Sequence, residues 1–135
     1  MDMAGYRPAI FISGHGMALI DLYRRFKIPV FWTTLLIVYG LAIMPADQAP
    51  DLGAGDKVNH MAAFFVLTLL GRAAYRPVAA WRLATGLSLF GILIELTQAI
   101  PAVRRDASVW DWVADSAAIL IALGAALIVE RLRRR

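Results

Sequence analysis

Four long runs of apolar residues, separated by short polar stretches, dominate this chain. They cover residues 28–44, 58–75, 83–100 and 109–129, and none of them has a proline in its middle. Each run has roughly the 17–25 residues that a helix needs to cross the hydrocarbon core of a bilayer. The pattern therefore predicts an all-α membrane protein, built as a bundle of four transmembrane helices.

The first 27 residues do not fit this pattern. Their apolar stretch, 9–22, is too short to span and is interrupted by Gly14, His15 and Asp21. Residues 17–27 are instead typical of a helix that lies in the membrane interface, with its arginines reaching towards headgroups. We therefore expect a cytoplasmic N-terminal arm at 1–27 and a transmembrane domain at 28–135. Pro29 would fall in the first turn of the first spanning helix, where its missing N–H costs nothing.

Composition supports a membrane protein. Hydrophobic residues make up 60% of the 135 residues, whereas soluble domains have about 45–50% apolar residues. The net charge of +4 could indicate nucleic acid as a partner. However, the basic residues flank the apolar runs instead of lining one soluble face, so membrane topology explains them better and we expect no nucleic acid. The chain has no cysteine, which excludes disulfides and thiolate chemistry.

The basic residues also predict the orientation. With four spanning helices, both termini and the connection between the second and third runs lie on one side of the membrane. Eleven of the fourteen basic residues fall on that side: Arg7, Arg24, Arg25, Lys27, Arg72, Arg76, Arg82, Arg131, Arg133, Arg134 and Arg135. Because positive residues stay in the cytoplasm, we expect a multi-pass protein of the cytoplasmic (inner) membrane with both termini inside.

Glu95 is the most unusual residue, because it interrupts the apolar run 83–100. A carboxylate inside a spanning helix costs roughly 2.5–3.5 kcal/mol on insertion scales. Such a residue usually faces the interior of the bundle, has a partner and marks a functional site.

The outer ends of the last three runs carry further polar side chains at helical spacing. Three pairs are separated by three or four residues: Asp56 and His60, Glu95 and Gln98, and Asp111 and Asp115. This spacing places the two members of each pair on one face of a helix. Because the pairs lie at similar depth, we predict one shared outer-face polar site from these six residues with Lys57 and Arg105.

The chemistry of this site stays open among three alternatives. Carboxylates and imidazole could bind a divalent cation through His60, Glu95, Asp111 and Asp115. The arginines could instead hold a phosphate, or another anionic headgroup, while the acids position them. In the third alternative, Glu95 or His60 acts as a general acid or base. The sequence assigns neither a reaction nor a cofactor.

A purely structural interpretation stands beside these alternatives. Acids in the first turn of a helix stabilise it through its dipole, and Lys57 and Arg105 could simply anchor helices at the interface. His60 could be an ordinary packed histidine, and Gln98 could hydrogen-bond between helices. The first run has no ionisable side chain apart from Tyr39, so we expect it mainly to pack against the others.

Residues 56–126 resemble the VanZ-like family of small membrane proteins, which is named for a member linked to teicoplanin resistance. Three elements carry the resemblance: residues 56–60 with Ala63 and Phe64, residues 91–98 leading to Pro101, and residues 105–115. The chain departs from the family at two positions. Asp115 stands where the family usually has asparagine, and Ala118 stands where it has glycine.

The resemblance implies a four-helix membrane protein with a link to the cell envelope and glycopeptide tolerance, and it brings no reaction with it. We therefore expect a protein that binds or processes an envelope component at the outer leaflet, such as a lipid-linked phosphate. The alternative is a structural or accessory subunit whose polar network holds the helix bundle together.

Overall fold

A computed structural model describes residues 14–45, 47–48 and 55–135, without the side chains of residues 14–17, 19 and 56. Most of the expected N-terminal arm therefore lies outside the described residues. The described part consists of four α-helices and one short 3-10 helix: α1 (Gly14–Ala42), α2 (Asp56–Ala74), α3 (Ala80–Gln98), η1 (Pro101–Val103) and α4 (Val109–Leu132). The prediction of an all-α protein with these helices in this order is confirmed.

Three of the described helices are long and apolar enough to cross a membrane. They are Ile20–Ala42 within α1, Ala80–Gln98 (α3) and Val109–Leu132 (α4). Helix α2 has 19 residues, but its sequence includes the charged residues Asp56, Lys57 and Arg72. The chain is thus a helical protein with three candidate membrane-spanning helices, which indicates a membrane protein.

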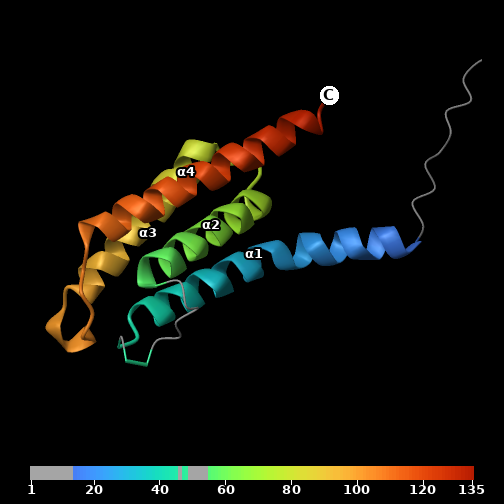
Figure 1. The fold of residues 1–135 in the computed structure, drawn as a ribbon. Helices are drawn as coiled ribbons and strands as arrows, with labels where there is room; N and C mark the ends of the chain where they lie inside the picture. Colours follow the sequence, from blue (N-terminus) through green and yellow to red (C-terminus); the bar gives the residue numbers. More distant parts are fainter. Residues whose placement is uncertain (1–13, 46, 49–54) are drawn as a thin grey trace, which may run out of the picture.

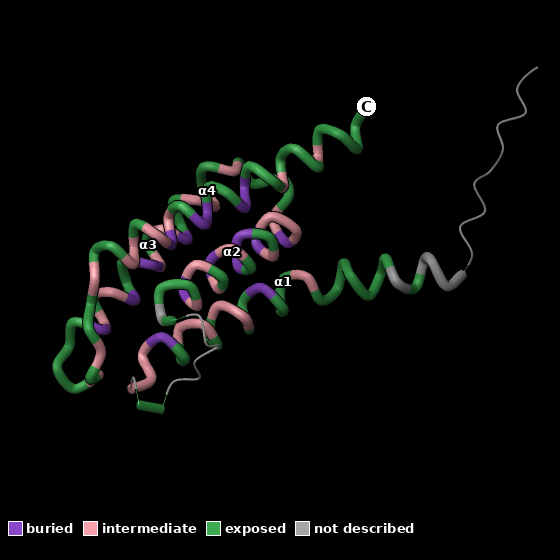
Figure 2. The backbone as a smooth tube through the Cα atoms, in the orientation of Figure 1, coloured by how far each residue is buried: buried purple, intermediate pink, exposed green. Residues whose placement is uncertain are grey.

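Helix α2 lies in the middle of the bundle, between α1 and α4, and it also contacts α3 (Figure 1). Its residues Phe64, Leu67 and Thr68 are completely buried (Figure 2). The Thr68 hydroxyl donates to the carbonyl of Phe64 at 2.7 Å, so this buried polar group is satisfied within its own helix. Because α2 contacts three other helices, its polar residues His60 and Thr68 are buried within the bundle, whereas Lys57 at its start is exposed.

Close packing fixes α2 against its neighbours at Gly71. A Cβ atom at this position would lie 2.8 Å from Leu83 Cδ1 and 3.0 Å from Phe31 Cε2. The absence of a side chain therefore lets α1 and α3 approach α2 closely at its C-terminal end.

Helix α1 differs from the prediction. It is one continuous helix from Gly14 to Ala42, with Pro29 inside it, so the expected start near residue 28, with Pro29 in the first turn, is wrong. Proline removes one backbone hydrogen bond from a helix. Here the carbonyl left without that bond belongs to Arg25, which is exposed, so other donors can reach it and the helix continues. The N-terminal part of α1 extends away from the bundle (Figure 1).

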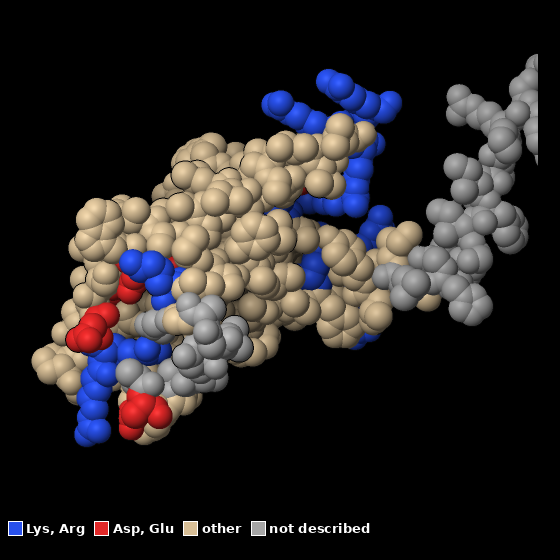
Figure 3. Space-filling model, viewed as in Figure 1, with Lys and Arg blue, Asp and Glu red and all other residues tan. Residues whose placement is uncertain are grey.

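Charged side chains gather at the two ends of the molecule, with an uncharged band between them (Figure 3). The arginine-rich end carries six exposed arginines: Arg76, Arg82, Arg131, Arg133, Arg134 and Arg135. On the face shown, acidic side chains are visible at the opposite end, together with basic ones. This distribution fits helices that lie across a bilayer and keep their charges at its two surfaces.

A partly buried ion pair joins α2 to α4 at the arginine-rich end. Arg72 Nη2 donates to Glu130 Oε2 at 2.8 Å. Its Nη1 donates to the carbonyl oxygens of Arg76, at 2.8 Å, and Val78, at 3.1 Å. One guanidinium thus connects the α2–α3 turn to the C-terminal part of α4, a role that sequence spacing did not indicate.

We expect Arg72→Met to lower the thermal stability of the purified protein in detergent. The change removes the ion pair and both bonds to the turn, and leaving such polar groups unpaired costs about 1–3 kcal/mol. Glu130→Gln should cost less, because its amide oxygen still accepts a hydrogen bond from Arg72. Thermal unfolding followed by tryptophan fluorescence measures both effects. Arg76→Met, which removes an exposed arginine from the same turn, is the control, and an equal loss there would contradict the prediction.

Candidate functional site

Four segments meet at the end of the bundle opposite the arginine-rich end (Figure 1). They are the start of α2, the end of α3, the connection that contains η1, and the start of α4. His60 lies in the first turns of α2, Glu95 in the last turn of α3, and Asp111 and Asp115 in the first turns of α4. Asp56 begins α2, but its side chain lies outside the described part of the structure.

Glu95 faces this meeting point. Its Oε2 accepts a hydrogen bond from the backbone N–H of Ser108 at 2.6 Å. Ser108 is the N-cap of α4, so the carboxylate at the end of α3 holds the beginning of α4 in place. The Oε1 atom is buried and has no hydrogen-bond partner among the described residues. His60, Asp111 and Asp115 all act electrostatically on this carboxyl group.

His60 and Asp115 form the deepest pair of the site. His60 Nδ1 lies 3.6 Å from Asp115 Oδ2, and the two residues are only 8% and 1% exposed. They come from α2 and α4, so the pair bridges the two helices at the core of the bundle. The pairing places an imidazole and a carboxylate together, as the predicted shared site requires.

Lys57 and Asp111 form a second, shallower pair. Lys57 Nζ lies 3.6 Å from Asp111 Oδ1, and the lysine side chain is 54% exposed. Exposed ion pairs contribute between about 0 and 1 kcal/mol, because water screens them. This contact therefore closes the outer edge of the site and adds little to stability.

Gln98 and Arg105 have a different role from the one expected for the site, because both reach α1. Gln98 is buried, and its Nε2 donates to the carbonyl of Ala42 at 2.9 Å. Arg105 Nε donates to Met44 O at 2.9 Å, and its Nη2 donates to Leu41 O at 3.4 Å. The last carbonyl groups of a helix lack partners within that helix. Gln98 and Arg105 supply such partners to Ala42 and Leu41, and Arg105 also binds the carbonyl of Met44 just after the helix, so α1 does more than pack.

The carboxylate cluster is accordingly smaller than the predicted site. We define it as Glu95, Asp111 and Asp115, with His60, Lys57 and the N–H of Ser108. Within the described part of the chain, no three His, Asp or Glu side chains are grouped so that they could hold a metal ion. Arg105 bonds to the carbonyl oxygens of Met44 and Leu41, and Lys57 is the cation that the structure pairs with a carboxylate of the cluster. The cluster thus carries more negative than positive charge.

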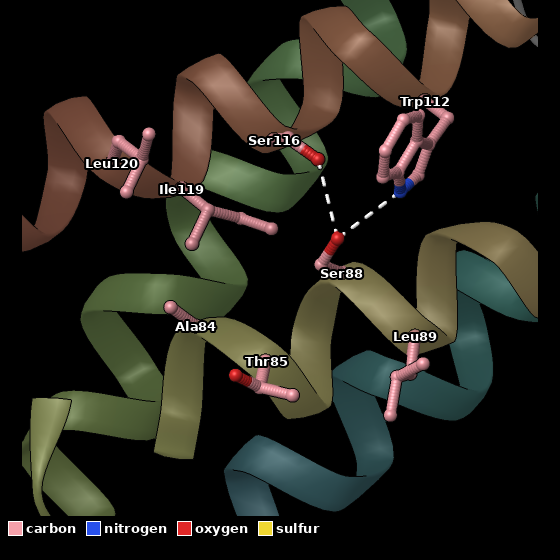
Figure 4. Close-up of a pocket in the computed structure, with 8 residues that line it drawn as sticks. All are labelled: Ala84, Thr85, Ser88, Leu89, Trp112, Ser116, Ile119 and Leu120. Carbon is pink, nitrogen blue, oxygen red and sulfur yellow. Dashed lines mark hydrogen bonds between the residues drawn. The ribbon is translucent and has the colours of Figure 1, made fainter. Parts of the chain in front are cut away.

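A groove lies between α3 and α4 (Figure 4). Its cavity volume is about 390 Å³, and its lining includes the apolar residues Ile119 and Leu120. Three of its polar groups are bonded to one another: Trp112 Nε1 donates to Ser88 Oγ at 3.0 Å, and Ser88 Oγ lies 3.3 Å from Ser116 Oγ. Trp112 directly follows Asp111 of the cluster in the sequence, but it faces α3, and the groove is lined by residues outside the cluster.

The sequence analysis did not identify this groove. The sequence contained one indication of the groove: Trp112 and Ser116 are four residues apart and therefore share a face of α4. The partner, Ser88, is a single hydroxyl within the apolar helix α3. Only the packing of α3 on α4 brings it opposite that face.

Because Glu95 and Arg105 have different partners, we expect their substitutions to affect thermal stability independently. Arg105→Gln should lower thermal stability, because it affects the end of α1, whereas Glu95→Gln should lower it only slightly, because glutamine still accepts from the Ser108 N–H at the start of α4, and the two effects should add. For such independent sites the coupling energy stays within about 0.5 kcal/mol. A double-mutant cycle of unfolding measurements in detergent tests this. Rescue of stability in the double variant would contradict it and would indicate a direct charge pair.

No protein-family model, curated protein or solved structure matches this chain. The similarity to the VanZ-like family stays an expectation, based on the sequence elements around His60, Glu95 and Asp111. The site is therefore characterised by its own geometry: a carboxylate cluster at one end of a helical bundle, and a separate groove between α3 and α4.

Proposed function

We propose that this chain is a multi-pass protein of the cytoplasmic membrane, a four-helix transmembrane bundle of the VanZ-like type with both termini in the cytoplasm. The gathering of exposed arginines at one end supports this orientation, since positive residues stay on the cytoplasmic side. Helix α2 serves as the fourth spanning helix. Its polar residues fit that role because α1, α3 and α4 surround it.

The protein, in this proposal, binds a lipid-anchored component of the cell envelope at the outer face of the membrane. The observation that carries the proposal is that helices α3 and α4 carry both features: the carboxylate cluster where α3 ends and α4 begins, and an apolar groove further along the same two helices. The polar head of the ligand would meet Glu95 and Asp111, and its apolar chain would lie along Ile119 and Leu120. A lipid at the membrane surface has its headgroup in water and its chain in hydrocarbon. The carboxylate cluster would contact the headgroup, and the groove would contact the chain.

The charges of the cluster favour a particular head group. Glu95 Oε1 is a buried acceptor without a donor among the described residues, and Asp111 and Asp115 add further negative charge. Hydroxyl and amino groups can donate to such acceptors, whereas phosphate would be repelled by them. Phosphate recognition usually relies on arginine, and Arg105 is bonded to α1 instead. A sugar-bearing or aminoacyl-bearing lipid therefore suits the site better than the lipid-linked phosphate that we first expected.

A second candidate function is a structural or accessory membrane subunit whose polar network holds the bundle together. The specific observation in its favour is that polar side chains repeatedly bridge helices. Gln98 bonds α3 to α1, the Arg72–Glu130 pair joins α2 to α4, and Tyr39 bonds to Thr97 at 3.1 Å. In this alternative the carboxylate cluster would be one more bridge, and it would not retain lipid.

The proposed topology can be tested with reporter fusions. Fusions after Asp51 and Ala102 should report the outer side of the membrane, and a fusion after Ala79 should report the cytoplasm. The reason is that the arginines of the α2–α3 turn and of the C-terminus should stay on the same, cytoplasmic side. A cytoplasmic signal at Ala102 would place the carboxylate cluster inside the cell and contradict binding at the outer leaflet.

The variant Glu95→Gln distinguishes lipid binding from the purely structural function. Glutamine retains an acceptor for the Ser108 N–H, so the fold and the membrane level should be preserved while the charge is lost. Native mass spectrometry should show that the wild-type protein retains monoglucosyl diacylglycerol in preference to phosphatidic acid with the same chains. A hydrogen bond to a charged acceptor contributes about 1.5–3 kcal/mol, so retention by Glu95→Gln should fall roughly tenfold or more.

Asp106→Asn is the matched control, because Asp106 is an exposed acid in the same connection. This variant should retain the glycolipid like the wild-type protein. Equal retention of both lipids by the wild-type protein, or equal retention of the glycolipid by all three proteins, would contradict the proposal. Loss of the folded protein in Glu95→Gln, with Asp106→Asn intact, would favour the structural subunit.

A further inference from the structure

A second groove lies at the arginine-rich end, between α1 and α3. It has a volume of about 300 Å³, and most of its lining is apolar, including Phe31 and Leu35 of α1 and Leu83 and Leu87 of α3. The groove exists because α1 packs mainly on α2 and meets α3 only over a short stretch. The carboxylate cluster is at the other end of the bundle, so the proposed function does not involve this groove.

Polar groups mark one mouth of the groove. Arg82 lines it and is exposed in the first turns of α3, where its guanidinium lies 5.3 Å from the ring of Trp81. Trp32 and Tyr75 line the same region, and Trp32 Nε1 donates to the Tyr75 hydroxyl at 2.8 Å. Tryptophan and tyrosine concentrate at the level of lipid headgroups. The mouth therefore lies where a headgroup would be, and the apolar lining lies deeper.

Charge complementarity identifies the occupant. Acidic residues do not contribute to the described lining of the groove, whereas Arg82 does. Glu130 lies near the α2–α3 turn, but its carboxylate already forms an ion pair with Arg72, at 2.8 Å. Exposed Arg76 lies in that turn and adds to the positive potential. Basic sites between helices at a membrane surface attract anionic lipid headgroups, at about 1 kcal/mol for each arginine.

We propose that the groove between α1 and α3 binds an anionic phospholipid of the leaflet at the arginine-rich end. One acyl chain lies against Phe31, Leu35 and Leu87, and the phosphate lies at Arg82. This lipid would contact both α1 and α3 and would thereby stabilise the packing of α1 against α3. The proposal stands whether or not the opposite end binds an envelope lipid.

Gly86 provides a sharp test because it lines the groove, and a Cβ built there meets no atom within 4 Å. Gly86→Leu should therefore fill the groove without disturbing the helices. Gly124→Leu is the matched control: Gly124 is on α4, a Cβ there also meets no atom within 4 Å, and it does not line the groove. Both changes replace glycine within a helix by a better helix former, so neither should lower the unfolding temperature in detergent.

The measurement is native mass spectrometry of the full chain with phosphatidylglycerol or phosphatidylcholine of identical acyl chains. The wild-type protein and Gly124→Leu should retain phosphatidylglycerol preferentially, and Gly86→Leu should lose that retention. Arg82→Gln should reduce the preference for phosphatidylglycerol about fivefold, as expected for one arginine at a headgroup. Equal retention of the two lipids by the wild-type protein would overturn the proposal, as would equal retention of phosphatidylglycerol by both leucine variants. Conversion of a dimer to a monomer by Gly86→Leu would also overturn it, because a second copy would then be the occupant.

Discussion

The central position of α2 is the constraint on which the rest of this structure depends. A hydrocarbon environment offers no hydrogen-bond partners, so polar groups within it must be satisfied by the protein. Helix α2 carries Lys57, His60 and Arg72, and each of these side chains has a partner on α4 or, for Arg72, on α4 and the α2–α3 turn. These polar residues are therefore the ones that attach α2 to its neighbours.

The two ends of the bundle use charge in different ways. At the arginine-rich end, one ion pair is partly buried and the remaining arginines are exposed, which suits contact with anionic headgroups. At the opposite end, carboxylates turn inwards: Glu95 caps the start of α4 through Ser108, and Asp115 lies against His60. This contrast is why we assign different lipid chemistries to the two ends.

Helix α1 is attached at several points along its length. Gln98 and Arg105 bond to carbonyl groups at and just beyond its C-terminal end, Tyr39 bonds to Thr97 on α3, and the Tyr23 hydroxyl donates to Ala73 O of α2 at 3.1 Å. Nearer the middle of the helix, Trp32 bonds to Tyr75, while the N-terminal part extends away from the bundle (Figure 1). Because α1 packs mainly on α2 and meets α3 only over a short stretch, the groove lined by Phe31, Leu35 and Arg82 remains between α1 and α3.

The sequence by itself determined the helices and their charged ends, because apolar run length and the placement of arginine are local properties. It also placed His60, Glu95, Asp111 and Asp115 at one end, since each pair follows from helical spacing. It could not assign Arg105 and Gln98 to the carbonyl groups of α1, or Arg72 to Glu130, which is 58 residues away. It also misplaced the start of α1, because a proline tolerated inside a helix resembles one that begins it. These features were decided only by tertiary packing, because a side chain's partner depends on which helices lie beside it.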